Sequence, residues 1–220
     1  MQRNRLGIFL MLGFLGLAAT AQAEEGIRVR PIDVYISGFA GYSFPFKTDF
    51  SYQGTTLISD LELDKSPSFG GKAGMWFTAP RKRLGIDIGV EADVTNFNPD
   101  TPRTLELQAT YFGVHVLARV PMEVTQELPN GRWFPYVGFG GGGQRIAFEA
   151  PGTTEGRHTA PAFHGLWGAK VFITKHIALF GEGKYTHASH TLTFQNPFST
   201  ADFDLTVRAL HGVGGLSVHF

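Results

Sequence analysis

The clearest pattern in the chain is a strict alternation of apolar and polar residues over the twelve positions 84–95. Every even position from Leu84 to Val94 is apolar, whereas Asp87, Glu91 and Asp93 occupy odd positions. A period of two places each set on its own face of a β-strand. The segment is longer than the mean globular strand of about 5 to 6 residues and matches a tilted membrane-spanning strand. It therefore predicts a strand between lipid on one face and a polar interior on the other.

Further segments repeat this alternation with decreasing clarity, and together they predict an all-β fold: an eight-stranded antiparallel transmembrane β-barrel. These segments are 33–46, 69–79, 105–120, 133–148, 163–174, 177–194 and 205–220. The phase of the pattern changes midway through 105–120, which predicts a β-bulge there. The glycine run 140–143 predicts a bend that relieves strain in a narrow barrel.

The connections between the segments alternate in length, which predicts the orientation of the barrel. Short ones at 80–83 and 175–176 alternate with longer ones at 47–68, 98–104, 149–162 and 195–204, and the connection at 121–132, assigned to the short side, fits the pattern least well. Outer-membrane barrels have short periplasmic turns and longer extracellular loops, so both chain ends are expected in the periplasm. Aromatic residues near the strand ends are expected to form girdles at the membrane interfaces. They are Tyr35, Trp76, Trp133, Tyr136 and Phe220.

The first 23 residues have the features of a secretion signal. Arg3 and Arg5 precede an apolar run at 6–19, and the tripeptide 21–23 is a small-residue cleavage site. The apolar run is shorter than the roughly 20 residues of a membrane helix. We expect the signal to be cleaved and residues 24–220 to form one barrel domain, the alternative being a retained N-terminal anchor.

Composition narrows the functional classes. The formal net charge is +0, from 19 Lys+Arg and 19 Asp+Glu, so no basic surface indicates a nucleic-acid partner. The chain has no cysteine and therefore neither disulfides nor thiolate metal ligands. Its 28 glycines and 20 phenylalanines suit strands that face lipid on one side better than a soluble periplasmic enzyme. No cofactor is expected.

The segment WFPYVGFGGGG at 133–143, the glycine- and aromatic-rich strands and the ending GGLSVHF at 214–220 resemble the small eight-stranded outer-membrane barrels of the OmpA/OmpX-like type. The resemblance covers the whole expected mature chain. It implies outer-membrane lipid and lipopolysaccharide as the surroundings of the protein. It also implies that the barrel assembly machinery reads the last strand, with Gly215, Val218 and Phe220 as the assembly signal.

Charged residues on the predicted inward face are the first candidates for function. They are Lys72, Asp87, Glu91, Asp93, Arg119, Lys170, Glu182 and Lys184. Side chains just fill the interior of an eight-stranded barrel, and an unpaired buried charge costs several kcal/mol. We therefore expect a luminal charge network that plugs the barrel. The alternative is a narrow gated pore, opened when ion pairs exchange partners.

His187 and Ser189 are weaker candidates, for catalysis. Their spacing resembles that of the catalytic pair in outer-membrane lipid A deacylases, which are also eight-stranded barrels. Asp202 or Asp204 would have to orient the imidazole, but the glutamate expected in that family is missing and His190 replaces its asparagine. His187 and His190 point to opposite faces of a strand, so no metal site is expected. A pair of polar rim residues is the favoured interpretation, and the chain is predicted to be non-enzymatic.

The longest connection, at 47–67, contains several apolar residues, among them Phe50, Tyr52 and Leu57. Loops on a rigid scaffold often carry recognition, so an extracellular partner would bind here. Packing on the rim, or extension of the flanking strands, is the simpler interpretation. The predicted function is a structural or surface-interaction role in the outer membrane. A soluble lipocalin-like barrel is the rival fold, because alternation alone does not say which face is inward.

Overall fold

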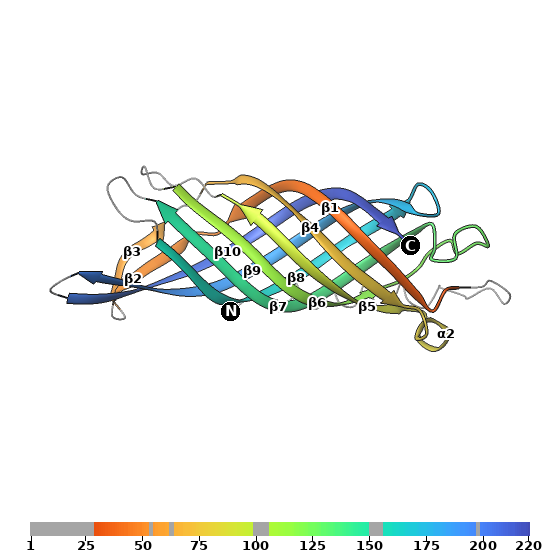
Figure 1. Cartoon of the computed structure of the whole chain (residues 1–220), viewed down its shortest axis with the longest axis horizontal. Coiled ribbons are helices and arrows are strands. Elements are labelled where there is room, and N and C mark those ends of the chain that lie inside the picture. The colour runs from red at the N-terminus through yellow and green to blue at the C-terminus, as the bar shows by residue number, and fades with distance from the viewer. Residues whose placement is uncertain (1–28, 53–54, 62–63, 99–105, 150–155, 197–198) are drawn as a thin grey trace, which may run out of the picture.

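The computed structural model describes residues 29–52, 55–61, 64–98, 106–149, 156–196 and 199–220, which are almost entirely β-strand. The strands wrap obliquely around an elongated cylinder (Figure 1). Within these residues the one helix is the single turn α2 (Arg81–Leu84). No helix in the described ranges is long and apolar enough to cross a membrane.

Eight strands form the barrel, each antiparallel to its neighbours. They are β1 (Ile32–Pro45), β4 (Ser66–Phe77), β5 (Asp87–Phe97), β6 (Glu106–Arg119), β7 (Trp133–Glu149), β8 (Gly156–Phe172), β9 (Ile177–Asn196) and β10 (Ser199–His219). The barrel closes because β1 pairs with β10, from Tyr35 opposite His219 to Pro45 opposite Ala209. The predicted eight-stranded antiparallel barrel is confirmed.

The two faces of the wall have opposite polarity. Among the described residues, 25 large hydrophobic side chains are exposed on the outside of the barrel or at its ends. On β5 the carboxylates Asp87, Glu91 and Asp93 are buried on the inside. A lipocalin-like barrel has the reverse arrangement, so that alternative is wrong. An apolar outer face of this extent requires lipid around it.

The connection at 47–67 contains a β-hairpin that extends the flanking strands, as one of the simpler interpretations of this segment expected. Strand β2 (Thr48–Tyr52) pairs with β3 (Thr55–Leu61) and also with β10, from Phe203 opposite Tyr52 to Leu205 opposite Phe50. Strands β9 and β10 have 20 and 21 residues, whereas about 9–11 residues cross a bilayer. Their far ends therefore project beyond the membrane, and the hairpin lies beside that projection (Figure 1).

Strand β6 runs without the predicted bulge. Its register with β5 and β7 is continuous from Ala109 to Arg119. Ala109 and Tyr111 are buried on the inner face together with His115. The sequence suggested a change of phase because this end of the inner face carries an alanine and an aromatic ring rather than charges.

The glycine run 140–143 lets β7 approach β6 closely. The register on both sides of β7 continues through the run without a shift. A Cβ atom added at Gly140 would overlap the backbone oxygen of Val114, and one added at Gly142 would overlap that of Phe112. These glycines are therefore needed for the close packing of two strongly curved strands.

We predict that Gly140→Ala destabilises the barrel, because the new methyl group must displace backbone. The expected loss is about 1–3 kcal/mol in the free energy of unfolding, measured by urea titration of the protein in lipid vesicles. Gly181→Ala is the matched control, since a Cβ at Gly181 meets nothing within 4 Å. Equal stability of the two variants would contradict this interpretation of the glycine run.

Candidate functional site

Paired charges fill much of the barrel lumen. Among the buried residues that the structure describes, five carboxylates accompany five cationic side chains. These are Asp33, Asp87, Glu91, Asp93 and Glu182, with Lys72, Arg81, Arg119, Lys170 and Lys184. The structure therefore places all eight charged residues selected from the sequence inside the barrel, and it adds Asp33 and Arg81 to them.

Arg119 organises the end of the lumen nearest the short turns. Its Nε lies 2.8 Å from Asp87 Oδ2, and its Nη1 lies 2.9 Å from Asp33 Oδ2. The guanidinium carbon is 4.6 Å from the centre of the Trp76 ring and 4.5 Å from that of Phe134. A planar guanidinium can pair with carboxylates along its edge while its faces contact aromatic rings. Arg119 thus joins residues of β1, β4, β5 and β7.

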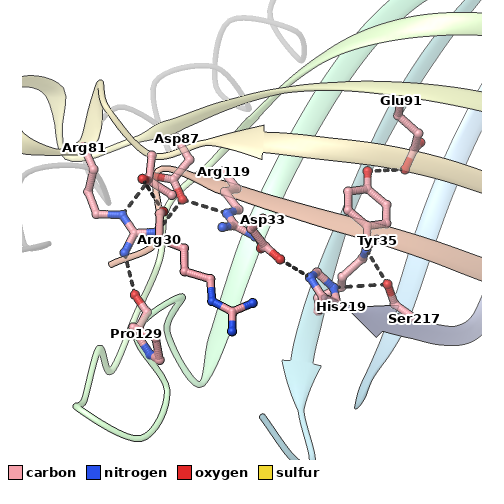
Figure 2. Close-up of polar contacts among 12 residues, drawn as sticks. Arg30, Asp33, Tyr35, Arg81, Asp87, Glu91, Arg119, Pro129, Ser217 and His219 are labelled. Carbon is pink, nitrogen blue, oxygen red and sulfur yellow. Dashed lines mark hydrogen bonds and ion pairs between the residues drawn. The ribbon is translucent and has the colours of Figure 1, made fainter. Parts of the chain in front are cut away.

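Arg81 ties two turns across this end of the barrel (Figure 2). Its Nε and Nη2 donate to the two carboxylate oxygens of Asp87, at 2.8 and 2.5 Å. Its Nη1 donates to the backbone oxygen of Pro129 at 2.7 Å. The local sequence positions the side chain, because Pro80 starts the single turn α2 and Gly85 ends it in the left-handed conformation, with φ 71°.

His219 links the last strand to the same network (Figure 2). Its Nδ1 lies 2.7 Å from Asp33 Oδ1, and its Nε2 lies 3.1 Å from Ser217 Oγ. The imidazole stacks on Tyr35, with ring centres 5.2 Å apart. Lys170 Nζ donates to Ser217 Oγ at 3.0 Å. The network therefore crosses the seam at which β1 and β10 close the barrel.

Glu182 is the hub of the central layer. It accepts from Lys72 Nζ at 2.5 Å and from the hydroxyl of Tyr136 at 2.6 Å. Lys72 Nζ is also 3.3 Å from Glu91 Oε2, and that oxygen accepts from the Tyr35 hydroxyl at 2.6 Å. Two carboxylates, one ammonium group and two phenols thus span the interior between β1, β4, β5, β7 and β9.

The other two lysines differ in their partners. Lys184 pairs with Asp93, lies 3.4 Å from Glu182 Oε1 and sits over the Phe39 ring at 3.9 Å. Lys170 takes part in none of the ion pairs found among the described residues. Instead its Nζ lies 3.8 Å from the centre of the Tyr35 ring. Cation–π contact and the serine hydroxyl therefore replace a carboxylate at this position.

Histidines line the part of the lumen nearer the long loops. From the sequence, His190 was weighed for a metal site, but these histidines were not connected as a group. His115 Nε2 lies 2.7 Å from His164 Nδ1, and His211 Nε2 lies 3.1 Å from Thr186 Oγ1. Further along, His190 Nε2 lies 3.1 Å from Gln144 Oε1. In the sequence these histidines alternate with apolar residues that face outward, and this alternation could have identified them as luminal. The described residues contain no group of three potential metal ligands.

Three aromatic residues assigned to interfacial girdles face the lumen instead. Tyr35, Trp76 and Tyr136 are each about 1% exposed, so that prediction was wrong for them. Their rings contact the buried cations, and the two phenols donate to carboxylates. Phe220, in contrast, is exposed on the outside.

The residues considered for catalysis, His187 and Ser189, form no hydrogen bond with each other in the described structure. His187 and Ser189 alternate with the buried residues of β9 and so lie on its outer face. Ser189 Oγ is 3.3 Å from Thr206 Oγ1, and no hydrogen bond between described residues connects it to His187. The side chains of Asp202 and Asp204 lie outside the described part of the structure.

The proposed assembly signal occupies both faces of β10. Val218 and Phe220 point outward, whereas Gly215 alternates with them on the inner face next to Phe180. Val213 also points inward and packs with Phe39 and Phe180. The proposed signal therefore consists of two lipid-facing residues and one inner glycine.

We predict that Arg119→Met lowers the free energy of unfolding by about 3–5 kcal/mol, because it leaves Asp33 without its guanidinium partner in a buried site. Urea titration in vesicles measures this loss. Lys82→Met at the same end is the control, since Lys82 is exposed, and we expect a change within about 0.5 kcal/mol. A loss for Arg119→Met no larger than that of the control would contradict a structural role for the network.

Comparison with known proteins agrees with this architecture. A family model described as "Outer membrane protein beta-barrel domain" matches residues 7–209. The outer membrane protein OprG from Pseudomonas aeruginosa is similar in fold, with TM-score 0.60 and 13% identity over 88% of this chain and 98% of that one. Neisserial surface protein A gives TM-score 0.51 and 15% identity over 85% and 97%. Among curated proteins no significant match was found. The chain belongs to the outer membrane protein β-barrel domain family, whose members span the outer membrane of Gram-negative bacteria.

Proposed function

We propose that this outer-membrane barrel is non-enzymatic, that its charge network closes the lumen to solutes, and that it has a structural role in the envelope. The observation that carries the proposal is Glu182. This single carboxylate holds Lys72 at 2.5 Å and Tyr136 at 2.6 Å and lies 3.4 Å from Lys184. Groups from β4, β7 and β9 thus meet at one buried point inside a barrel of small diameter.

The layer between Glu182 and the short turns supports a closed lumen. Toward the short turns lies an apolar cluster that includes Trp76, Phe134, Tyr136 and Phe172. Removing one partner of a buried ion pair costs about 3–5 kcal/mol. Because Lys72, Lys184 and Arg119 each contact two carboxylates, a solute passing through would have to break several pairs together. Such a passage is energetically unfavourable.

The second candidate is a gated pore, and two observations in the lumen favour it. Lys72 lies between Glu182 and Glu91, at 2.5 and 3.3 Å, so it can change partner without becoming unpaired. Lys170 has no carboxylate partner among the described residues and is available to take one. An exchange of this kind would widen one side of the lumen and make conduction sensitive to charge.

A surface role would depend on the β2–β3 hairpin. The hairpin lies beside the projecting end of β10, at the end of the barrel opposite the short turns (Figure 1). A projecting sheet edge is a common site for recognition by another protein. We therefore include an extracellular partner at 47–67 in the proposal.

Single-channel recording of the folded protein in a planar bilayer tests the closed lumen. We expect no discrete openings for the wild type, because the network is intact. We also expect none when 48–63 is replaced by a short Gly/Ser turn, since the plug is not the hairpin. Salt-dependent openings of the wild type that change with Glu182→Ala would overturn the closed barrel in favour of the pore. Openings that appear only without the hairpin would also contradict the proposal.

A further inference from the structure

The end of the barrel with the short turns carries an excess of exposed positive charge. Arg30, Lys82, Arg83, Arg132 and Lys175 are all exposed there. Glu123 and Glu127 are the exposed acidic side chains among the described residues of the same turns. These cations come from every connection at this end of the barrel and so surround its rim. We call these five cationic residues the basic rim.

The basic rim is in excess over the acidic side chains near it, Glu123 and Glu127, and forms no ion pair with them in the described part of the chain. No ion pair between described residues involves any of the five side chains. Figure 2 illustrates the difference, because Arg81 and Arg119 have drawn contacts with Asp87 whereas the guanidinium of Arg30 beside them has none. Exposed cations that are not used within the fold are available to an external anion.

The two ends of the barrel differ in the sign of their charge. The four long connections, 47–68, 98–104, 149–162 and 195–204, contain four Lys/Arg and nine Asp/Glu. The short-turn end has the opposite excess, formed by the basic rim. The leaflet that meets this end is the inner one, because short turns face the periplasm in this fold. A cationic rim there is electrostatically complementary to anionic lipid headgroups.

A pocket of about 210 Å³ opens in this rim beside the end of β10. Its lining includes Arg30, Lys175 and His176, one carboxylate, Glu127, and the rings of Phe172 and Phe220. Phe220 is 59% exposed, and Ile173, which flanks the same turn, is 60% exposed. The pocket thus combines cationic groups with a neighbouring apolar outer surface. Such a surface suits a ligand that has an anionic head and an apolar tail.

We propose that the basic rim binds anionic phospholipid of the inner leaflet, with one phosphodiester headgroup in the pocket between Arg30 and Lys175. The acyl chains would lie along the outer surface at Ile173 and Phe220. Each lysine or arginine near an anionic surface strengthens binding about fivefold. The site lies outside the luminal network and does not depend on whether the lumen conducts, so it goes beyond the proposed function.

Native mass spectrometry of the detergent-solubilised protein, with equal concentrations of phosphatidylglycerol and phosphatidylethanolamine, tests the site. We expect the wild type to retain phosphatidylglycerol at least tenfold in preference to phosphatidylethanolamine. Arg30→Gln combined with Lys175→Gln should abolish most of this preference, because two cations are lost from the pocket. Arg30→Lys combined with Lys175→Arg keeps both charges and should retain it.

Lys65→Gln combined with Arg145→Gln is the matched control, since it removes one lysine and one arginine that are exposed away from the short turns. We expect this variant to bind phosphatidylglycerol as the wild type does. The proposal is overturned if the wild type shows no preference, or if the control loses it equally. It is also overturned if inorganic phosphate displaces the lipid at millimolar concentration, which would indicate a site for a small anion. Heat-modifiable gel mobility verifies that each variant is folded.

Discussion

A charged side chain inside an eight-stranded barrel has neither bulk water around it nor space in which to move, so it must find a partner within the wall. This constraint accounts for most of the interior of the molecule. Five carboxylates and five cations are buried together, and several of them contact more than one partner. Because several of these side chains share a partner, moving one of them changes the pairing of the others, which favours one arrangement of the set.

The aromatic residues extend this arrangement where carboxylates are too few. Arg119 lies between Trp76 and Phe134, and Lys170 lies against Tyr35. Each ring fills space beside a cation and attracts it, while the tyrosine hydroxyls also donate to Glu91 and Glu182. The same side chains thus fill the narrow interior and stabilise the buried cations. The exposed basic rim lies outside this balance, and for that reason its cations remain available to lipid.

Much of the wall could be predicted from the sequence, because alternate residues of a strand point to opposite faces. The assignment of Asp87, Glu91 and Asp93 to one side needed only the period of two. Asp33 and His219 also alternate in step with the inward residues of their strands. Each lies at the end of its strand, however, where few neighbouring positions remain to show the alternation. Arg81 was beyond prediction, since it enters the lumen from a turn that is closed by Gly85.

The errors have a common physical origin. Tyr35, Trp76 and Tyr136 were expected at the membrane interface because aromatic rings are usually found there, but a cation-rich lumen also attracts them. Because aromatic rings were expected to face outward, the inward position of Tyr111 was not predicted. Its place in the pattern was instead interpreted as a bulge in β6, which is not present. Extension of the strands through the β2–β3 hairpin was among the interpretations of 47–67, but its pairing with the far end of β10 joins segments about 150 residues apart, and no local pattern indicates such a contact.

A double-mutant cycle between Lys72 and Glu182 tests the central claim most directly. The free energies of unfolding of the wild type, Lys72→Met, Glu182→Gln and the double variant would be measured in lipid vesicles. If the charges hold each other in place, the double variant is more stable than the sum of the single losses implies, by about 1–3 kcal/mol. Losses that add within about 0.5 kcal/mol would show that the two side chains fill space independently, and would contradict a cooperative charge network.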